Sequence, residues 1–408
     1  MKRRDLIRNL SLLPMAGAAV AAGALIPDNA VAAPAPASKR DLFKELGVRT
    51  FINAAGTYTF MTGSLMRKEV VDAIRSAAQD FCLLDELQDK VGAKIATMVH
   101  AESAVVTSGC FSAITLGLAG VLTGMDQTRV EQLPHLAGTG MKSEVIMQKG
   151  HSIGYSHALT NTGCTMVVVE TISDVEKAIN DKTAMLWFLN IQSDNGLINH
   201  QQWVALGKKY NIPTMIDMAA DVPPVENLWK FNDMGFDLVC VSGGKAIRGP
   251  QSTGVLMGKK DLIAAARLSM PPRGSTIGRG MKVNKEEVLG MYVALEHFIN
   301  ADHDKEWKEW EGRVATIETA IKNITGVTTE VKVPTLGNVT PTLHVTWDKT
   351  KLKITTKDLQ EKLRNGSPSI EIVNNGEEHI SITTWVMLPG QEKIVAKRLS
   401  QELAAATA

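Results

Sequence analysis

Cysteine is scarce in this sequence, and no cysteine stands in a metal-binding pattern. The chain contains four, Cys82, Cys110, Cys164 and Cys240. No two of them have the short spacing that zinc sites and dithiol redox motifs require, so we predict no metal site. Cys110 opens a predicted helix and Cys240 lies in an apolar run, which favours buried thiols over catalytic ones. Spacing alone leaves disulfide pairing open.

An excess of charge is absent too. The 408 residues include 44 basic and 43 acidic side chains, for a formal net charge of +1. This balance produces no excess positive potential that would attract a nucleic-acid backbone, so nucleic acid is not an expected partner. Hydrophobic and charged fractions of 44% and 21% are ordinary for a globular protein, and the length suits two domains.

Long hydrophobic runs are missing except near the start of the chain. Arg3 and Arg4 precede an uncharged stretch at 10–26 and a small-residue site at 30–32. This arrangement resembles a twin-arginine export signal, predicted to cover residues 1–33; a general secretory signal or a membrane anchor is the alternative reading. The resemblance implies export of the folded protein by the twin-arginine machinery, to the periplasm. Residues 34–89 are expected to form a spacer and an N-terminal arm.

The middle of the chain alternates short apolar runs with helix-like stretches, which is typical of a mainly parallel α/β sheet. Helices are expected at 173–180 and 200–210. The expected strands cover 104–107, 144–147, 166–169, 184–189, 213–218, 236–241 and 254–257. These seven strands fit one sheet in a large domain at 90–284.

The pattern changes after a Pro-Pro-Arg-Gly break at 271–274. An amphipathic stretch follows at 285–321, and a closing helix is expected at 391–405. Between them, strands are expected at 342–347, 370–373 and 379–385. We therefore predict a smaller α+β domain at 285–408.

Lys245 follows the strand expected at 236–241, in the segment SGGKAIRGPQSTG. A lysine at the carboxyl end of such a strand lies where open α/β sheets bind ligands. Its amine attacks an aldehyde only when neutral, and desolvation beside other cations promotes that state. The adjacent glycines would leave room for a bulky ring. By itself the Gly-Gly-Lys triplet is more typical of a solvated loop lysine.

Asp217 ends the preceding strand, at 213–218. An aspartate in this position can pair with a protonated pyridine nitrogen and so keep the ring an electron sink. A helix cap or a structural ion pair is the plainer interpretation. Asp221 is a rival candidate, but it lies beyond the strand and beside two prolines. We favour Asp217.

The segment Thr107-Ser108-Gly109-Cys110 joins the first strand of the sheet to a small-residue helix. Backbone amides at such a helix start form an anion site suited to a phosphate. Ser242 and Arg248 could add a hydroxyl and a charge. A lysine, an aspartate and a phosphate loop, all at strand ends, together predict a site for pyridoxal 5'-phosphate (PLP).

Four segments carry a resemblance to a known family: SGGKAIRGPQSTGVLMG, MIDMAAD, TSGCFSAI and INAAGTYTFMTGS. They resemble the L-seryl-tRNA(Sec) selenium transferase-like branch of fold-type-I PLP enzymes, which includes D-glucosaminate-6-phosphate ammonia-lyase. The likeness spans about residues 41–403. It implies the fold-type-I PLP-dependent transferase fold and a homodimer or larger homo-oligomer with shared active sites.

The resemblance also implies roles for individual residues. Lys245 matches the Schiff-base lysine, Asp217 the partner of the pyridine nitrogen, and Ser108, Gly109 and Cys110 the phosphate loop.

Four further positions match more peripheral parts of the family's site, and a fifth, Gln192, lies nearby in the predicted fold. His151 matches a residue that stacks on the cofactor, although a histidine after a strand is often a simple loop residue. Asn53 and Thr57 belong to an N-terminal active-site loop, and Gln192 lies on a sheet-edge loop that could face substrate. Arg279 matches a basic position that binds the substrate's acidic group or a neighbouring subunit's phosphate, and an exposed loop arginine is the alternative.

The predicted activity is that of a PLP-dependent lyase, which removes an α-proton and eliminates a β-substituent from a small amino acid or amino-sugar acid. Seryl-tRNA is not an expected substrate, because the chain carries an export signal where the tRNA-dependent enzymes carry a tRNA-binding domain. A class-V-like aminotransferase, a selenium-transferase-like transferase and an exported binding protein without chemistry remain alternatives. Side-chain specificity resides in loops that the sequence does not resolve.

Overall fold

The computed structural model describes residues 40–377 and 379–407. The predicted signal peptide at 1–33 and the start of the spacer lie outside these residues. The chain divides into two compact units after Arg49. The described part of the first unit holds one short helix, α1 (Leu42–Glu45), whose first turn is capped by Asp41. All other elements belong to the second unit.

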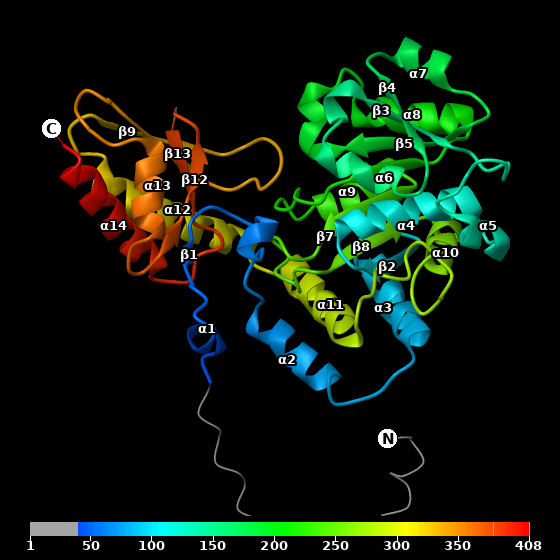
Figure 1. The fold of residues 1–408 in the computed structure, drawn as a ribbon, viewed down its shortest axis with the longest axis horizontal. Helices are drawn as coiled ribbons and strands as arrows, with labels where there is room; N and C mark the ends of the chain where they lie inside the picture. The colour runs from blue at the N-terminus through cyan, green and yellow to red at the C-terminus, as the bar shows by residue number, and fades with distance from the viewer. Residues whose placement is uncertain (1–39, 378, 408) are drawn as a thin grey trace, which may run out of the picture. The chain divides into compact units, whose positions relative to one another are not determined.

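A seven-stranded sheet organises the second unit (Figure 1). Its strands are β2 (Ser103–Thr107), β3 (Glu144–Gln148), β4 (Thr165–Val169), β5 (Thr183–Leu189), β6 (Thr214–Asp217), β7 (Leu238–Ser242) and β8 (Gly254–Gly258). Their order is β2-β8-β7-β6-β5-β3-β4, and β8 alone runs antiparallel to its neighbours. The prediction of seven strands in one mainly parallel α/β sheet is confirmed.

Alternation along the strands creates a hydrophobic core on each face of this sheet. In β5, Leu186 and Phe188 face one core, while Met185 and Trp187 face the other. The first core is covered by α3 (Leu84–Met98), α7 (Ile172–Ala178), α8 (His200–Tyr210), α9 (Asn227–Met234) and α11 (Lys285–Ile299). The second is covered by α4 (Cys110–Thr123), α6 (His157–Thr160) and α10 (Lys260–Leu268). Helix α2 (Lys68–Ala77) adds Val70 to the first core and packs against α11, and α5 (Gln127–Gln132) packs against α4.

A smaller antiparallel sheet follows, with the order β12-β13-β10-β9. Its strands are β9 (Val327–Lys332), β10 (Thr342–Trp347), β12 (Val373–Asn375) and β13 (His379–Thr383). Helices α12 (His303–Ile321), α13 (Thr356–Arg364) and α14 (Gln391–Ala405) pack with them around a third core. The N-terminal arm joins this part through β1 (Ile52–Asn53), which pairs in parallel with β11 (Ile370–Glu371). The smaller α+β part is confirmed.

The helices refine two details of the predicted organisation. The amphipathic stretch at 285–321 is two helices, because Asp302 caps a new helix start by accepting from the Lys305 amide. Residues of α11 pack in the core of the large sheet, and those of α12 pack in the third core. The proposed division at 285 therefore remains a prediction, and the division at 89/90 falls inside α3.

No helix within the described residues combines the length and apolarity that a membrane span requires.

Candidate active site

A cavity of about 640 Å³ lies at the carboxyl ends of β5, β6 and β7, beside the start of α4. The opposite wall comes from the segment 334–342 and from β12 and β13. Among the described residues that line it, only Lys245, Asp217 and Asp221 carry a formal charge. The predicted lysine and aspartate thus meet in one cavity, as their positions at neighbouring strand ends implied.

The loop that presents Lys245 is held by the N-terminal arm. Ser64 Oγ donates to the Lys245 carbonyl at 2.7 Å, and the Ser64 amide donates to the Gly244 carbonyl at 3.1 Å. A Cβ at Gly243 would come within 2.3 Å of Thr253 Oγ1, and one at Gly244 within 2.4 Å of Gln251 Cα. The glycines therefore serve close backbone packing within the loop, rather than the ring space that the sequence suggested.

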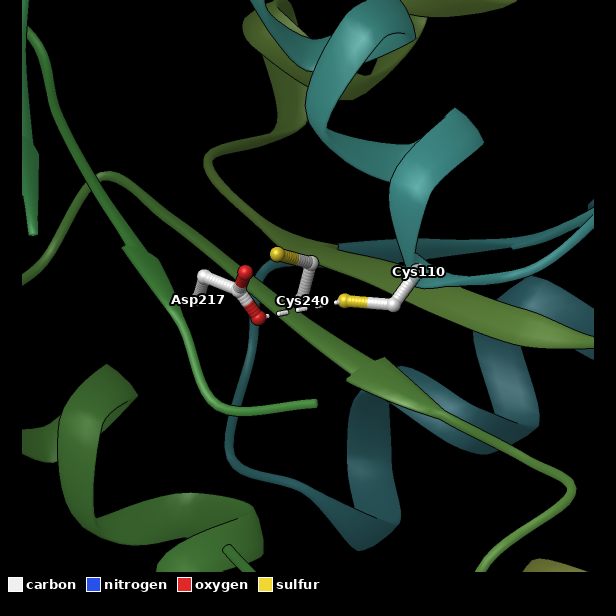
Figure 2. Close-up of side chains that lie close together, drawn as sticks. All are labelled: Cys110, Asp217 and Cys240. Carbon is white, nitrogen blue, oxygen red and sulfur yellow. Dashed lines mark hydrogen bonds between the residues drawn. The ribbon is translucent and has the colours of Figure 1, made fainter. Parts of the chain in front are cut away.

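Asp217 is buried at the end of β6, with 3% of its surface exposed. Its Oδ1 accepts from the Ala219 amide at 2.9 Å and from the Cys110 thiol at 3.4 Å (Figure 2). Burial raises the pKa of this carboxyl, and the two donors and Lys245 partly offset the effect. With Oδ1 occupied twice, the other oxygen is the one left to receive a cationic ring nitrogen.

Cys240 completes a cluster that sequence spacing did not indicate. The parallel register of β6 and β7 sets Cys240 opposite Asp217, and one ligand atom from each of Cys110, Asp217 and Cys240 lies within 4.8 Å of the others. The contact with Cys240 and burial raise the pKa of Cys110, and burial raises that of Cys240. The thiols therefore act as neutral donors at neutral pH. All four cysteines, of which only Cys82 is exposed, are free thiols.

The start of α4 is open to an anion. Gly109 occupies the N-cap position at φ +91°, and no side chain caps the helix there. Gly254 of β8 lets the loop approach, because a Cβ at this position would lie 2.6 Å from the Cys110 amide. Gly109 and Cys110 line the cavity, whereas the Ser108 hydroxyl donates to Ser112 Oγ at 3.0 Å. Uncapped amides at a helix start suit a phosphate.

The remaining predicted residues divide between the cavity and its surroundings. Ser242 and Thr57 line the cavity. Asn53 shapes the loop before Thr57: its Oδ1 accepts from the Ala55 and Gly56 amides at 2.9 and 3.0 Å.

Gln192 lies in the 3-10 segment η4 (Asn190–Asn195), accepts from Asn195, and is not among the lining residues. Arg279 is exposed and also lies outside the lining, so its role toward substrate or a neighbouring subunit stays a prediction. Arg248 donates to the Leu65 carbonyl and lines a separate cavity, so it does not add its charge here.

His151 is not among the residues that line the cavity, and its stacking on the cofactor stays a prediction. The ring is fully buried, packs edge-on against Phe188 with centroids 4.5 Å apart, and accepts from the Leu189 amide at 3.1 Å. Burial lowers the pKa of His151 to about 4, so the ring is neutral. Phe111 and Tyr155 do line the cavity, and either could supply an aromatic face.

Asp221 is a member of the site that the sequence reading had set aside as a rival to Asp217. It is 2% exposed, and its Oδ1 accepts from the Gly337 amide at 3.1 Å. Burial and the neighbouring Asp217 raise the pKa of Asp221 to about 6, although Asn190 and Lys245 partly offset them. The carboxyl thus links the β6 loop to the wall contributed by the C-terminal part.

The sequence of the chain matches a known protein family. Residues 83–329 match the family described as Aminotransferase class-V. The chain belongs to the class-V aminotransferase family. Its cofactor is PLP, and the residues fit that group: an amine, a buried carboxylate and open helix amides line one cavity.

This chain is similar to three proteins whose names denote different activities. It is 28% identical to D-glucosaminate-6-phosphate ammonia lyase of Salmonella typhimurium, over 81% of this chain and 88% of the relative. It is 25% identical to 5'-C-glycyluridine monooxygenase-decarboxylase of a Streptomyces species, over 88% and 92%. It is 24% identical to L-seryl-tRNA(Sec) selenium transferase of Aquifex aeolicus, over 79% and 77%.

Solved structures agree on the architecture. The structure of D-glucosaminate-6-phosphate ammonia-lyase matches with a TM-score of 0.78 and 26% identity, over 90% of this chain and all of the other. A serine palmitoyltransferase with bound PLP matches with a TM-score of 0.55 and 14% identity, over 88% and 89%, which supports the fold alone. The expected fold-type-I architecture is confirmed.

Removal of the Cys110 thiol tests its contact with Asp217. Cys110→Ala should weaken PLP binding about 5-fold, since a lost hydrogen bond costs about 1 kcal/mol and leaves Asp217 less readily ionised. Cys110→Ser should retain most of the affinity. Cys164→Ala, which removes a buried thiol outside the cavity lining, serves as the control. Titration of each protein with PLP, followed by absorbance, measures the effect; equal affinities for Cys110→Ala and Cys164→Ala would contradict it.

The raised pKa of Asp221 predicts that Asp221→Asn stabilises the fold, by an amount that depends on pH. Above pH 6 the buried charge lowers the stability of the unaltered protein. The variant should therefore unfold at a higher urea concentration, with a free energy of unfolding larger by roughly 1–3 kcal/mol at pH 7.5. The gain should shrink as the pH falls from 6 toward 4, because the folded protein then binds the proton more readily than the unfolded chain. A gain that is constant across this range would show that the Asp221 pKa is not raised.

Proposed function

We propose that the protein is a PLP-dependent lyase that releases ammonia from a small amino acid or amino-sugar acid, with Lys245 as the Schiff-base lysine. The observation that carries this proposal is the convergence of Lys245, Asp217 and the uncapped start of α4 on one cavity. The similarity to an ammonia lyase over most of both chains favours elimination.

Bound PLP supplies an electron sink for the negative charge that forms at the substrate's α-carbon. In our proposal Lys245 would hold the cofactor, and its amine would move the α-proton of the substrate as acid and base. Asp217 keeps the ring nitrogen protonated. Its burial makes this pairing strong, because the surrounding protein screens the two charges less than water does.

Transamination is the second candidate, because the same residues would support it. The similarity to an enzyme named as a monooxygenase-decarboxylase shows that relatives at this level of identity differ in reaction. The products distinguish the candidates: a lyase releases ammonia and a 2-keto acid in one turnover, whereas an aminotransferase retains the amino group until a second substrate arrives.

Lys245→Ala tests the central assignment. The variant should lose the yellow absorbance of the PLP-loaded protein and at least about 10³-fold of its activity, since no other described lysine lines the cavity. Lys282→Ala, in an exposed lysine outside the lining, is the matched control. Persistence of the absorbance in Lys245→Ala would refute the assignment, and its absence from the unaltered PLP-loaded protein would favour a binding protein without chemistry.

We also propose export to the periplasm through the twin-arginine machinery, because Arg3 and Arg4 precede an uncharged stretch. Replacement of both arginines by lysine should keep the protein in the cytoplasm, as measured by fractionation of the host cells. Unchanged export of the double variant would argue for the general secretory route. Assembly into a homo-oligomer, with the exposed Arg279 near a neighbouring site, is part of the same proposal and is measurable by light scattering.

A further inference from the structure

The cluster of Cys110, Asp217 and Cys240 brings together two thiols and a carboxyl inside the protein. Cys110 begins α4, Asp217 ends β6 and Cys240 lies in β7, and the three side chains point toward one another (Figure 2). Sulfur ligands select zinc and similar thiophilic ions over magnesium and calcium. The cluster is therefore a candidate site for a thiophilic ion, which the spacing of the cysteines along the chain did not indicate.

The distances within the cluster suit tetrahedral coordination. Zn²⁺ binds a cysteine sulfur at about 2.3 Å and a carboxylate oxygen at about 2.0 Å, so a sulfur and an oxygen on one ion are about 3.5 Å apart and two sulfurs about 3.8 Å. Cys110 Sγ and Asp217 Oδ1 are 3.4 Å apart. Cys240 Sγ lies within 4.8 Å of the ligand atoms of the other two. Small shifts of the side chains would therefore close three ligands around one ion.

The surroundings of the cluster supply the other parts of a metal site. The Ala219 amide donates to Asp217 Oδ1 at 2.9 Å and orients the carboxylate, as the outer partners of metal ligands do. Cys110 and Asp217 line the cavity, which gives an ion a route of entry and leaves room for water as a fourth ligand. Cys240 is fully buried and is not among the lining residues, so the sheet would shield the ion on that side.

Metal binding at this cluster must displace protons. Contact with Cys240 raises the pKa of the Cys110 thiol, and burial raises the pKa of Cys240, so both thiols are protonated without metal. Each would release its proton to water, because the thiolate is the ligand. A divalent ion with two thiolates and one carboxylate has a net charge of −1, which the positive charge of Lys245 partly offsets.

We propose that Cys110, Cys240 and Asp217 bind a thiophilic divalent ion such as Zn²⁺, and that this ion and PLP exclude each other. The ion takes up the negative charge of Asp217, which the protonated ring nitrogen of the cofactor needs. It also holds Cys110, which begins the helix whose amides we propose as the phosphate site. The ion would thus inhibit the enzyme by keeping it without cofactor. The mutual exclusion rests on the proposed function of Asp217 at the ring nitrogen, whereas the metal site does not.

The test titrates the PLP-free and the PLP-loaded full chain with Cd²⁺, a substitute for Zn²⁺ whose bonds to thiolates absorb in the ultraviolet. Every protein carries Cys82→Ser, which removes the exposed thiol. We expect the PLP-free chain to bind one ion, and the PLP-loaded chain to bind it at least about 10-fold more weakly. One equivalent of Cd²⁺ should weaken PLP binding by the same factor, because coupling between two ligands is reciprocal.

Each other outcome of this titration counts against one part of the proposal. Absence of thiolate absorbance in the PLP-free chain would overturn the metal site. Cadmium binding that PLP does not weaken would overturn the mutual exclusion. Neither measurement uses ammonia release, so a failure of the lyase proposal is seen separately and leaves both results decisive.

Variants assign the absorbance to the cluster. Loss of an outer partner of a metal ligand costs about 10–100-fold in affinity, so loss of a ligand in Cys240→Ser should weaken Cd²⁺ binding at least about 100-fold. Cys164→Ser, at a buried thiol outside the cavity lining, is the matched control and should leave the affinity unchanged. Cys240→Ala replaces Cys240→Ser if circular dichroism shows that the buried hydroxyl prevents folding. An unchanged affinity in the folded variant would show that Cys240 is not a ligand and would overturn the proposal.

Discussion

The buried carboxyl of Asp217 is the group around which the site is arranged. It ends β6 inside the protein, where an isolated charge is costly, and its Oδ1 is held by the Ala219 amide and the Cys110 thiol. Those donors come from the β6 turn and the start of α4, so the carboxyl ties the sheet to the helix whose uncapped amides we propose as the phosphate site. Each end of the proposed cofactor thus depends on the same local packing.

The two sides of the cavity come from different parts of the fold and contribute different groups. The strand ends of the large sheet bring Lys245, Asp217 and the α4 amides to one cavity, and this set fits the PLP cofactor of the family. The other wall comes from the C-terminal part, which contributes both polar and apolar side chains. Asp221 connects the two sides through its hydrogen bond to the Gly337 amide, so its ionisation bears on both.

Much of the fold was predictable because its signals are local. All seven strands of the large sheet occur where short apolar runs indicated them, and α8, β10 and α14 have the predicted bounds. The orientation of side chains depends on packing between distant segments and has no such local signal. His151 follows a strand as expected, yet its ring turns into the core against Phe188. Gln192 turns toward Asn195 within its own loop. Neither direction follows from the order of residues along the chain.

The sequence by itself predicted that Lys245, Asp217 and the 107–110 loop meet in one cavity, because each ends or closely follows a strand, and parallel strands place their carboxyl ends at one edge. Only the tertiary structure decided what surrounds that set. The register of β6 and β7 brings Cys240 opposite Asp217, and the packing of α4 brings the Cys110 thiol within 3.4 Å of the same carboxyl. The wall contributed by the segment 334–342, β12 and β13 likewise needs residues far along the chain to fold over the cavity, and no pattern of neighbouring residues indicates such an approach.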